Sequence, residues 1–263
     1  MRAISIGAVS LFLVGAIVSP ALAAPPANDD RGNAKVVGPL PYQDSIDTSE
    51  ATPQVSDPDC VSGPDNPTVW YSFTPGEDGR YGASTFGSDY DTTLFVGTPD
   101  NGGFNVIDCS DDTVGLSSSV VWQAQAGTEY LIMVGACCGS PGGQLEFVLR
   151  RNPPVPAIQV SIAARGSINR FGAAIIRGQT RCNNAAGAQG FIEVSVRQTA
   201  GRFFIRGEGG AGLRCNRSWR VRAQGNIGVF KPGKVRVRAT AFVCGAFACG
   251  DDQASRTVRL RLN

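Results

Sequence analysis

The 263-residue chain contains no histidine. This absence excludes Ser-His-Asp and Cys-His nucleophilic catalysis, and it excludes the usual His-containing zinc sites. Carboxylates, lysine and tyrosine are the side chains that remain for acid–base chemistry. Amphipathic helical stretches of useful length are absent as well, and so are long apolar runs after residue 23. No later segment is therefore expected to cross a bilayer.

The first 23 residues have the pattern of an export signal. Met1-Arg2 precede an apolar run from Ile4 to Val18, and Pro20-Ala21-Leu22-Ala23 offers small residues for cleavage after Ala23. The alternative is an uncleaved N-terminal anchor. No cysteine follows the site directly, which argues against a lipid anchor. We therefore expect a secreted, extracellular protein with no anchor in its mature form.

Charge is divided unequally along the chain. Residues 25–150 hold 18 Asp and Glu against 4 Lys and Arg, whereas residues 155–263 hold 4 against 18. The change coincides with Arg150-Arg151-Asn152-Pro153-Pro154-Val155-Pro156. A segment this rich in proline cannot continue a sheet and is typical of a semi-rigid linker. We expect an acidic domain over 24–150, a linker over 151–156 and a basic domain over 157–263.

Short alternating runs, broken by Gly, Pro, Asn and Asp, predict an all-β protein. The strands expected in the acidic domain are 35–39, 44–49, 68–74, 80–86, 92–98, 118–125, 129–135 and 144–150. Those expected in the basic domain are 158–164, 173–182, 191–198, 203–207, 218–224, 234–244 and 256–262. We therefore expect two β-sandwich domains in tandem after a signal peptide, the first jelly-roll-like and the second immunoglobulin-like.

Several segments of the acidic domain together carry a resemblance. They are Ala27-Asn28-Asp29-Asp30 with Asn33-Ala34, Val69-Trp70-Tyr71-Ser72-Phe73-Thr74, Gly87-Ser88-Asp89-Tyr90-Asp91-Thr92-Thr93-Leu94, Cys109-Ser110-Asp111-Asp112, and Ala126-Gly127-Thr128-Glu129-Tyr130-Leu131-Ile132. In this order and spacing, residues 27–150 resemble the bacterial pre-peptidase C-terminal domain. The resemblance implies a β-sandwich that serves secreted enzymes, often peptidases, as a targeting or binding accessory and is not itself catalytic. This chain departs from that pattern, because no peptidase stands before the domain and because it carries the adjacent pair Cys137-Cys138.

The basic domain carries a weaker resemblance. Cys182, Cys215 and the Phe230-Lys231-Pro232-Gly233 turn before the penultimate strand are similar to features of small exported bacterial Ig-like domains. That resemblance implies a fold and names no activity.

Eight cysteines in an exported chain indicate disulfides. In the basic domain the simplest scheme pairs Cys182 with Cys215 and Cys244 with Cys249. The alternative to structural bridges is a metal thiolate or redox site, but the CxxC spacing that such sites favour is absent.

The acidic domain leaves its pairing open. We expect Cys60 and Cys109 to share the adjacent Cys137 and Cys138. Four cysteines allow three connectivities, and the sequence alone does not choose among them.

Acidic and amide side chains gather in the expected loops of the acidic domain. They are Asn28, Asp29, Asp30, Asp89, Asp91, Asp111 and Asp112. Calcium takes six to eight oxygen ligands, so loops that meet at one end of a sandwich would form a calcium site. One alternative is a solvated acidic rim with Asp as a turn residue. Another is a hydrolase with paired carboxyls ~5 Å or more apart, although no residue stands out as the raised-pKa acid.

Arginines occupy the outward positions of the basic strands. They are Arg197, Arg220, Arg222, Arg236, Arg238, Arg259 and Arg261. If their strands adjoin, they form a basic face that suits phosphates, sulfates and carboxylates, as on teichoic or uronic glycans, extracellular DNA or an acidic protein. One alternative is a solvated face that prevents edge pairing. The other is electrostatic docking on the acidic domain.

Trp70, Trp122 and Trp219 lie within strand patterns, so we expect them in the core and not on a glycan-stacking platform. Without an aromatic stack, nucleic acid is the weaker partner for the arginines. The expected function is therefore non-catalytic: an exported binding or adhesion protein that attaches to an extracellular glycan or protein polymer, or to an anionic cell-surface component. The alternative is a secreted hydrolase, or a hydrolase accessory subunit, that uses the acidic loops of the first domain.

Overall fold

The computed structural model describes residues 24–59, 67–101, 103–185 and 188–262. The expected signal segment 1–23 and Cys60 lie outside these residues. Regular structure within them consists of seventeen strands and one short 3-10 helix, η1 (Arg31–Asn33), so the all-β prediction is confirmed. In the described part of the chain, no helix is long and apolar enough to span a membrane.

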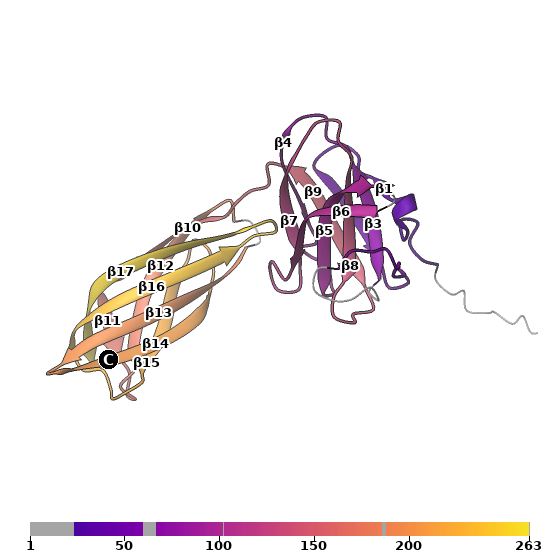
Figure 1. Ribbon diagram of the computed structural model, residues 1–263. Helices are drawn as coiled ribbons and strands as arrows, with labels where there is room; N and C mark the ends of the chain where they lie inside the picture. The colour runs from indigo at the N-terminus through magenta and orange to yellow at the C-terminus, as the bar shows by residue number, and fades with distance from the viewer. Residues whose placement is uncertain (1–23, 60–66, 102, 186–187, 263) are drawn as a thin grey trace, which may run out of the picture.

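The N-terminal sandwich (residues 24–151) consists of two sheets that face each other, drawn in indigo to magenta in Figure 1. Its strands are β1 (Lys35–Val36), β2 (Tyr42–Asp47), β3 (Thr68–Phe73), β4 (Gly79–Ser84), β5 (Thr92–Asp100), β6 (Gly103–Asp111), β7 (Ser119–Ala124), β8 (Tyr130–Ala136) and β9 (Gln144–Arg151). The sheet orders are β1-β3-β8-β5-β6 and β2-β9-β4-β7. Apart from the added β1, the eight strands alternate between the sheets, except that β5 and β6 are antiparallel neighbours in one sheet. This is the strand order of a jelly roll, as expected.

The sandwich core follows from the alternation of its central strands. On β3, Val69, Tyr71 and Phe73 point into the main core, whereas Trp70 points to the opposite face of the sheet. Phe104 covers Trp70 there, with the ring centroids 5.4 Å apart. The central strand β8 is buried along its whole length, which matches its apolar character on both faces.

Strand β6 was not expected from the sequence. It holds Gly103, Asn105 and Asp108, residue types that favour turns, and it lies at the edge of its sheet. Its apolar residues Val106 and Ile107 are exposed, so they leave no buried-face signature. Pairing with β5 over nearly its full length forms the strand in spite of this composition.

The C-terminal sheet (residues 157–262) is the elongated yellow-to-orange body of Figure 1. Its strands are β10 (Ala157–Ile162), β11 (Arg165–Ile168), β12 (Ala174–Asn183), β13 (Gln189–Ala200), β14 (Phe203–Leu213), β15 (Ser218–Gly225), β16 (Gly233–Cys244) and β17 (Cys249–Leu262). The order is β10-β12-β11-β17-β16-β13-β14-β15, and β12 also pairs with β15.

The β12–β15 and β13–β16–β17 pairings form the two facing layers of an immunoglobulin-like arrangement. The layers are nevertheless continuous, which differs from the expected pair of separate sheets. Strand β11, too short to be expected, pairs with both β12 and β17. The long, glycine-rich β14 pairs with β13 and then reaches β15. The sheet therefore closes around one core.

Strict alternation is confirmed where it was expected. On β16 the valines and alanines point inward while Arg236 and Arg238 are exposed. On β17, Val258 and Leu260 are buried, whereas Leu262 is exposed because it stands at the strand end.

The two parts meet through an apolar joint. The tip of the β16–β17 hairpin places Phe247 against Gly82 of β4, where a Cβ would lie 3.1 Å from the Phe247 ring and 2.8 Å from Pro153. Arg80 Nη1 donates to the Pro153 carbonyl at 3.1 Å. Both ion pairs of the described residues, Lys35–Asp44 and Arg151–Glu77, lie within the sandwich. Neither described ion pair therefore crosses between the two parts, and the alternative of electrostatic docking stays untested.

The disulfides agree with the scheme for the basic half and correct the one for the acidic half. Cys182 pairs with Cys215, and Cys244 pairs with Cys249. Cys137 pairs with Cys138, its neighbour in the chain, so the expectation that other cysteines share this pair is wrong. Cys109 is disulfide-bonded as well.

Candidate functional site

An acidic cluster forms at one end of the sandwich, where β5 begins and β6 ends. Asp91 precedes β5, Asp111 closes β6, and Asp112 follows with a φ of 56°. Because β5 and β6 are antiparallel neighbours, these ends meet, and one oxygen of each carboxylate lies within 4.8 Å of the others. Three of the seven expected calcium ligands are therefore together.

The surroundings of the acidic cluster disfavour the ionised form of its carboxylates. Burial, and then the charge of Asp112, raise the pKa of Asp91 above its usual value. Burial, followed by Asp112 and Asp91, likewise raises the pKa of Asp111, although the Asp112 N–H opposes this. Oδ1 of Asp91 and Oδ1 of Asp111 are buried without a hydrogen-bond partner among the described atoms. Unpaired buried oxygens at such a cluster suit a cation.

The Cys137–Cys138 disulfide borders the acidic cluster. Cys137 N donates to the Asp91 carbonyl at 2.9 Å, and Cys137 Sγ lies 3.6 Å from Asp111 Oδ2. Since both sulfurs are in the disulfide, they are not thiolate ligands. They form an apolar wall beside the carboxylates.

The other four expected calcium ligands lie elsewhere, and three of them form hydrogen bonds that hold the fold. Asn28 is buried and donates through Nδ2 to the Trp70 carbonyl at 3.0 Å. Asp29 accepts from the Thr52 N–H and hydroxyl, and Asp89 Oδ1 accepts from Gln144 N at 2.8 Å. Asp30 is exposed at the start of η1.

Three arginines form a row across the C-terminal sheet. Arg206 of β14 lies directly opposite Arg197 of β13, which lies directly opposite Arg236 of β16. We call these three the arginine row. All three are exposed, and among the described residues neither of the two ion pairs involves them. Neighbouring strands are about 4.8 Å apart, so three like charges stand side by side.

An aromatic ring orients the middle of the arginine row. The Arg197 guanidinium carbon lies 3.6 Å from the centroid of Phe204. Stacking of this kind covers one face of the guanidinium and leaves its N–H edge free for an in-plane anion. Lys234, Arg236 and Phe204 also border a shallow hollow of about 350 Å³ on this face.

The seven expected arginines divide between the two layers. Arg238, Arg259 and Arg261 lie on the same layer as Arg197 and Arg236, on β16 and β17. Arg220 and Arg222 lie on β15, which pairs with β12 in the opposite layer, where Arg220 stands opposite Arg177. The sequence therefore placed them outward correctly but not on one face.

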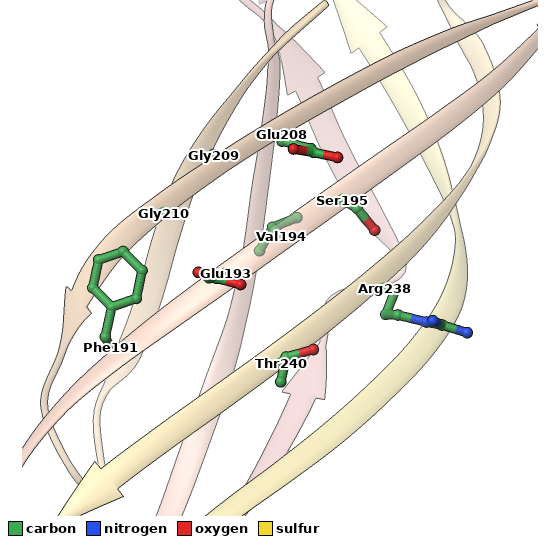
Figure 2. A pocket seen from close by; sticks show the side chains of 9 residues that line it. All are labelled: Phe191, Glu193, Val194, Ser195, Glu208, Gly209, Gly210, Arg238 and Thr240. Carbon is green, nitrogen blue, oxygen red and sulfur yellow. The ribbon is translucent and has the colours of Figure 1, made fainter.

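A larger hollow, of about 500 Å³, lies beside the arginine row on the outer face of β13, β14 and β16 (Figure 2). Figure 2 shows Glu193 and Ser195 on β13, with Arg238 and Thr240 on β16 across from them. Gly210 forms part of its floor, because a Cβ there would lie 2.3 Å from Phe191 Cζ. The hollow is open, and its lining is mixed: charged and hydroxyl side chains, apolar groups and one aromatic ring.

The tryptophans are buried, with Trp70 at 0%, Trp122 at 4% and Trp219 at 6% exposure, so they form no platform. Sequence reasoning missed a different aromatic set. Phe191, Phe203, Phe204 and Phe242 are exposed on the same layer as the arginine row. The outward positions of Phe191 and Phe242 in their alternating strands carried this signal. The arginine row therefore has aromatic neighbours that the sequence did not indicate, and the choice of partner stays untested.

No protein-family model matches this chain, and no curated protein matches it. Among solved structures, it is similar to a Parabacteroides merdae β-glucuronidase, with a TM-score of 0.24 and 11% identity over 76% of this chain and 28% of that one. A β-glycosidase from Bacteroides vulgatus has a TM-score of 0.21 and 11% identity over 80% and 29%. The chain spans less than a third of these enzymes' length. Likeness at this level supports no conclusion about this chain.

Proposed function

We propose that this protein is an exported, non-catalytic binding protein that attaches to an anionic extracellular polymer or cell-surface component. The binding surface is the outer face of β13, β14 and β16. One observation carries the proposal: Arg206, Arg197 and Arg236 stand directly opposite one another with no described ion pair. The disulfides and the signal-like residues 1–23 support the extracellular location.

Like charges directly opposite on neighbouring strands destabilise a sheet. An anionic ligand would remove this cost, because a guanidinium fork donates hydrogen bonds to two oxygens of a carboxylate, sulfate or phosphate at once. Stacking on Phe204 orients Arg197 before the ligand arrives, which reduces the entropy lost on binding. The neighbouring hollow offers Ser195 and Thr240 hydroxyls to the uncharged part of a polymer.

The test is binding to immobilised dextran sulfate at several salt concentrations. The double variant Arg197→Ala, Arg236→Ala should bind at least about tenfold more weakly, and wild-type affinity should fall steeply with salt. The matched control is Arg177→Ala with Arg220→Ala, a directly opposed arginine pair on the other layer. Equal losses in both double variants would show that net charge alone matters and would contradict the proposal.

Calcium is the proposed cofactor, held by Asp91, Asp111 and Asp112. The unpartnered Oδ1 atoms of Asp91 and Asp111 support it. Millimolar calcium should raise the Tm of the sandwich, since a ligand of the folded state stabilises it. Asp111→Asn should abolish the rise. Asp89→Asn should keep it, because an amide oxygen still accepts from Gln144 N. A folded protein with no calcium response would contradict this proposal.

The sandwich would act as an accessory module, a role that the resemblance of residues 27–150 to the pre-peptidase C-terminal domain supports. The rival proposal is a hydrolase that uses the acidic cluster. Its carboxylate oxygens lie within 4.8 Å of one another, near the separation in retaining glycosidases. The two hollows described above are lined by residues of the C-terminal sheet and not by the acidic cluster. Their position favours binding over hydrolysis. Polysaccharide cleavage lost specifically in Asp111→Asn would support the hydrolase.

A further inference from the structure

One end of the C-terminal sheet exposes a group of large apolar side chains, here called the end patch. Its members and their exposed fractions are Phe171 58%, Phe203 79%, Ile227 82%, Val229 50% and Leu262 73%. They come from the β11–β12 loop, the start of β14, the β15–β16 loop and the end of β17. Exposed apolar groups of this kind mark a contact with another molecule or with a membrane.

Contacts between the loops hold the end patch together. The Phe230 N–H donates to the Gly172 carbonyl at 3.0 Å, and a Cβ on Gly172 would lie 2.4 Å from Val229. The Asn226 N–H donates to the Arg206 carbonyl at 2.8 Å, which ties the β15–β16 loop to β14. Figure 1 shows the C-terminus at this end, far from the N-terminal sandwich.

Cations surround the end patch and none of the described acidic side chains pairs with them. The guanidinium carbons of Arg170 and Arg222 lie 4.7 and 6.0 Å from the Phe171 ring centroid. Arg206 follows Phe203 by three residues on β14. At about 3.3 Å per residue, the arginine row stands about 10 Å behind the tip.

We propose that the end patch inserts into an anionic lipid surface while the arginine row binds the head-group phosphates. This inference rests on the proposed function and names its anionic component as a lipid layer. A soluble polyanion would satisfy the arginines but leave the end patch in water. Interfacial segments bury apolar side chains about 5–10 Å deep beneath basic ones, which matches the spacing of the end patch and the arginine row. Charge complementarity with anionic head groups selects the lipid.

The experiment measures sedimentation of the chain with vesicles, using protein without residues 1–23 because that apolar run would itself bind lipid. Vesicles of phosphatidylcholine with about a third phosphatidylglycerol should bind it, and phosphatidylcholine alone should bind it much less. The variant Phe203→Ser, Ile227→Ser should lose about tenfold in partitioning per side chain. Its binding to dextran sulfate should not change.

The matched control replaces two exposed apolar residues of the sandwich, Val106→Ser with Ile107→Ser, and should partition like wild type. As a second measurement, the tryptophan fluorescence of the variant Phe203→Trp should shift to the blue when vesicles are added, because the new indole leaves water. The three native tryptophans are buried, so their emission should stay constant. An end-patch variant that partitions like wild type would overturn the inference, as would equal binding to neutral vesicles. Binding to dextran sulfate without any vesicle binding would overturn the lipid inference alone, whereas binding to neither would overturn the proposed function too.

Discussion

The N-terminal sandwich and the C-terminal sheet carry opposite charge for different physical reasons. In the sandwich, carboxylates such as Asp29, Asp78 and Asp89 accept hydrogen bonds from backbone N–H groups of other loops. In the sheet, arginines stand on the outward positions of long strands, and no described ion pair involves them. Acidity in the first part is thus partly structural, whereas the basic charge of the second is available to a partner.

The comparison shows that net charge is a poor guide to a binding surface until the partners of each charge are known. Asp29 and Asp89 proved to hold other segments through their carboxylates, whereas Asp91, Asp111 and Asp112 lie together. One oxygen each of Asp91 and Asp111 is buried there without a described hydrogen-bond partner. The arginines of the C-terminal sheet form no described ion pair. The outward side chains of a strand are not needed as partners for backbone groups, because the neighbouring strands already pair with the backbone. Four predictions test how far the two parts differ.

The largest expected effect comes from Phe147→Ala. Phe147 is fully buried and stacks on Tyr71 with the ring centroids 4.0 Å apart. Its truncation should lower the free energy of unfolding of the sandwich by about 3–5 kcal/mol. The cores of the two parts share no residue, so calorimetry should show one transition shifted down and the other unchanged. A single transition that moves as a whole would show that the parts unfold together.

Removal of the disulfides should affect the C-terminal sheet unequally. Cys182 and Cys215 are 33 residues apart, whereas Cys244 and Cys249 are 5 apart. From loop entropy, replacing the first pair by serine should cost about 4 kcal/mol and replacing the second about 2 kcal/mol. Denaturant titration of both variants measures the free energy of unfolding that each has lost and so shows which loss is larger. A reversed order would mean that contacts at the hairpin tip, such as Phe247 on Gly82, outweigh loop entropy.

High pH should destabilise the sandwich selectively, because every tyrosine lies within it. They are Tyr42, Tyr71, Tyr81, Tyr90 and Tyr130. Burial raises the pKa of Tyr90 to about 12, and burial followed by the charge of Asp44 raises the pKa of Tyr71 further. The neutral phenols favour the folded state, so their contribution is complete below about pH 10 and is lost as the pH rises through the folded pKa values.

Scanning the Tm of each transition from neutral pH upward checks this expectation. The sandwich transition should fall first, while the C-terminal sheet should hold because arginine stays charged throughout. Tyr90→Phe should weaken the alkaline decline of the sandwich. A parallel decline of both transitions would assign the effect to something other than the tyrosines.

The smallest expected effect comes from removing a surface charge. This change should stabilise the C-terminal sheet and destabilise the sandwich. Arg236→Gln should stabilise the C-terminal sheet by a few tenths of a kcal/mol at low salt, because it relieves repulsion from Arg197. Lys35→Gln should destabilise the sandwich by less than about 1 kcal/mol, because it removes the 2.7 Å ion pair with Asp44. Both differences should shrink in high salt. Destabilisation by Arg236→Gln would show that the arginine row is not strained.

Strand positions were predictable where apolar and polar residues alternate, as in β13 and β16, because that period reports directly which side faces the core. Two strands were missed because pairing alone makes them: the edge strand β6 and the four-residue β11. The site was half predictable. Arg197 and Arg236 were marked as outward, but Arg206 was not, although it lies within the expected strand 203–207. The apolar run Phe203-Phe204-Ile205 before it shows no alternation that would mark its side.

The sequence by itself determined the all-β class and, in the alternating strands, the side on which a residue lies, because these depend on composition and on a two-residue period. Export stays a prediction. Only the tertiary structure decided which distant strands are neighbours. That choice aligned Arg206, Arg197 and Arg236 in one row, moved Arg220 and Arg222 to the other layer, and brought Asp91 to Asp111. It also joined Cys137 to its own neighbour. Pairing between remote strands depends on closing a whole core, and a local pattern does not contain it.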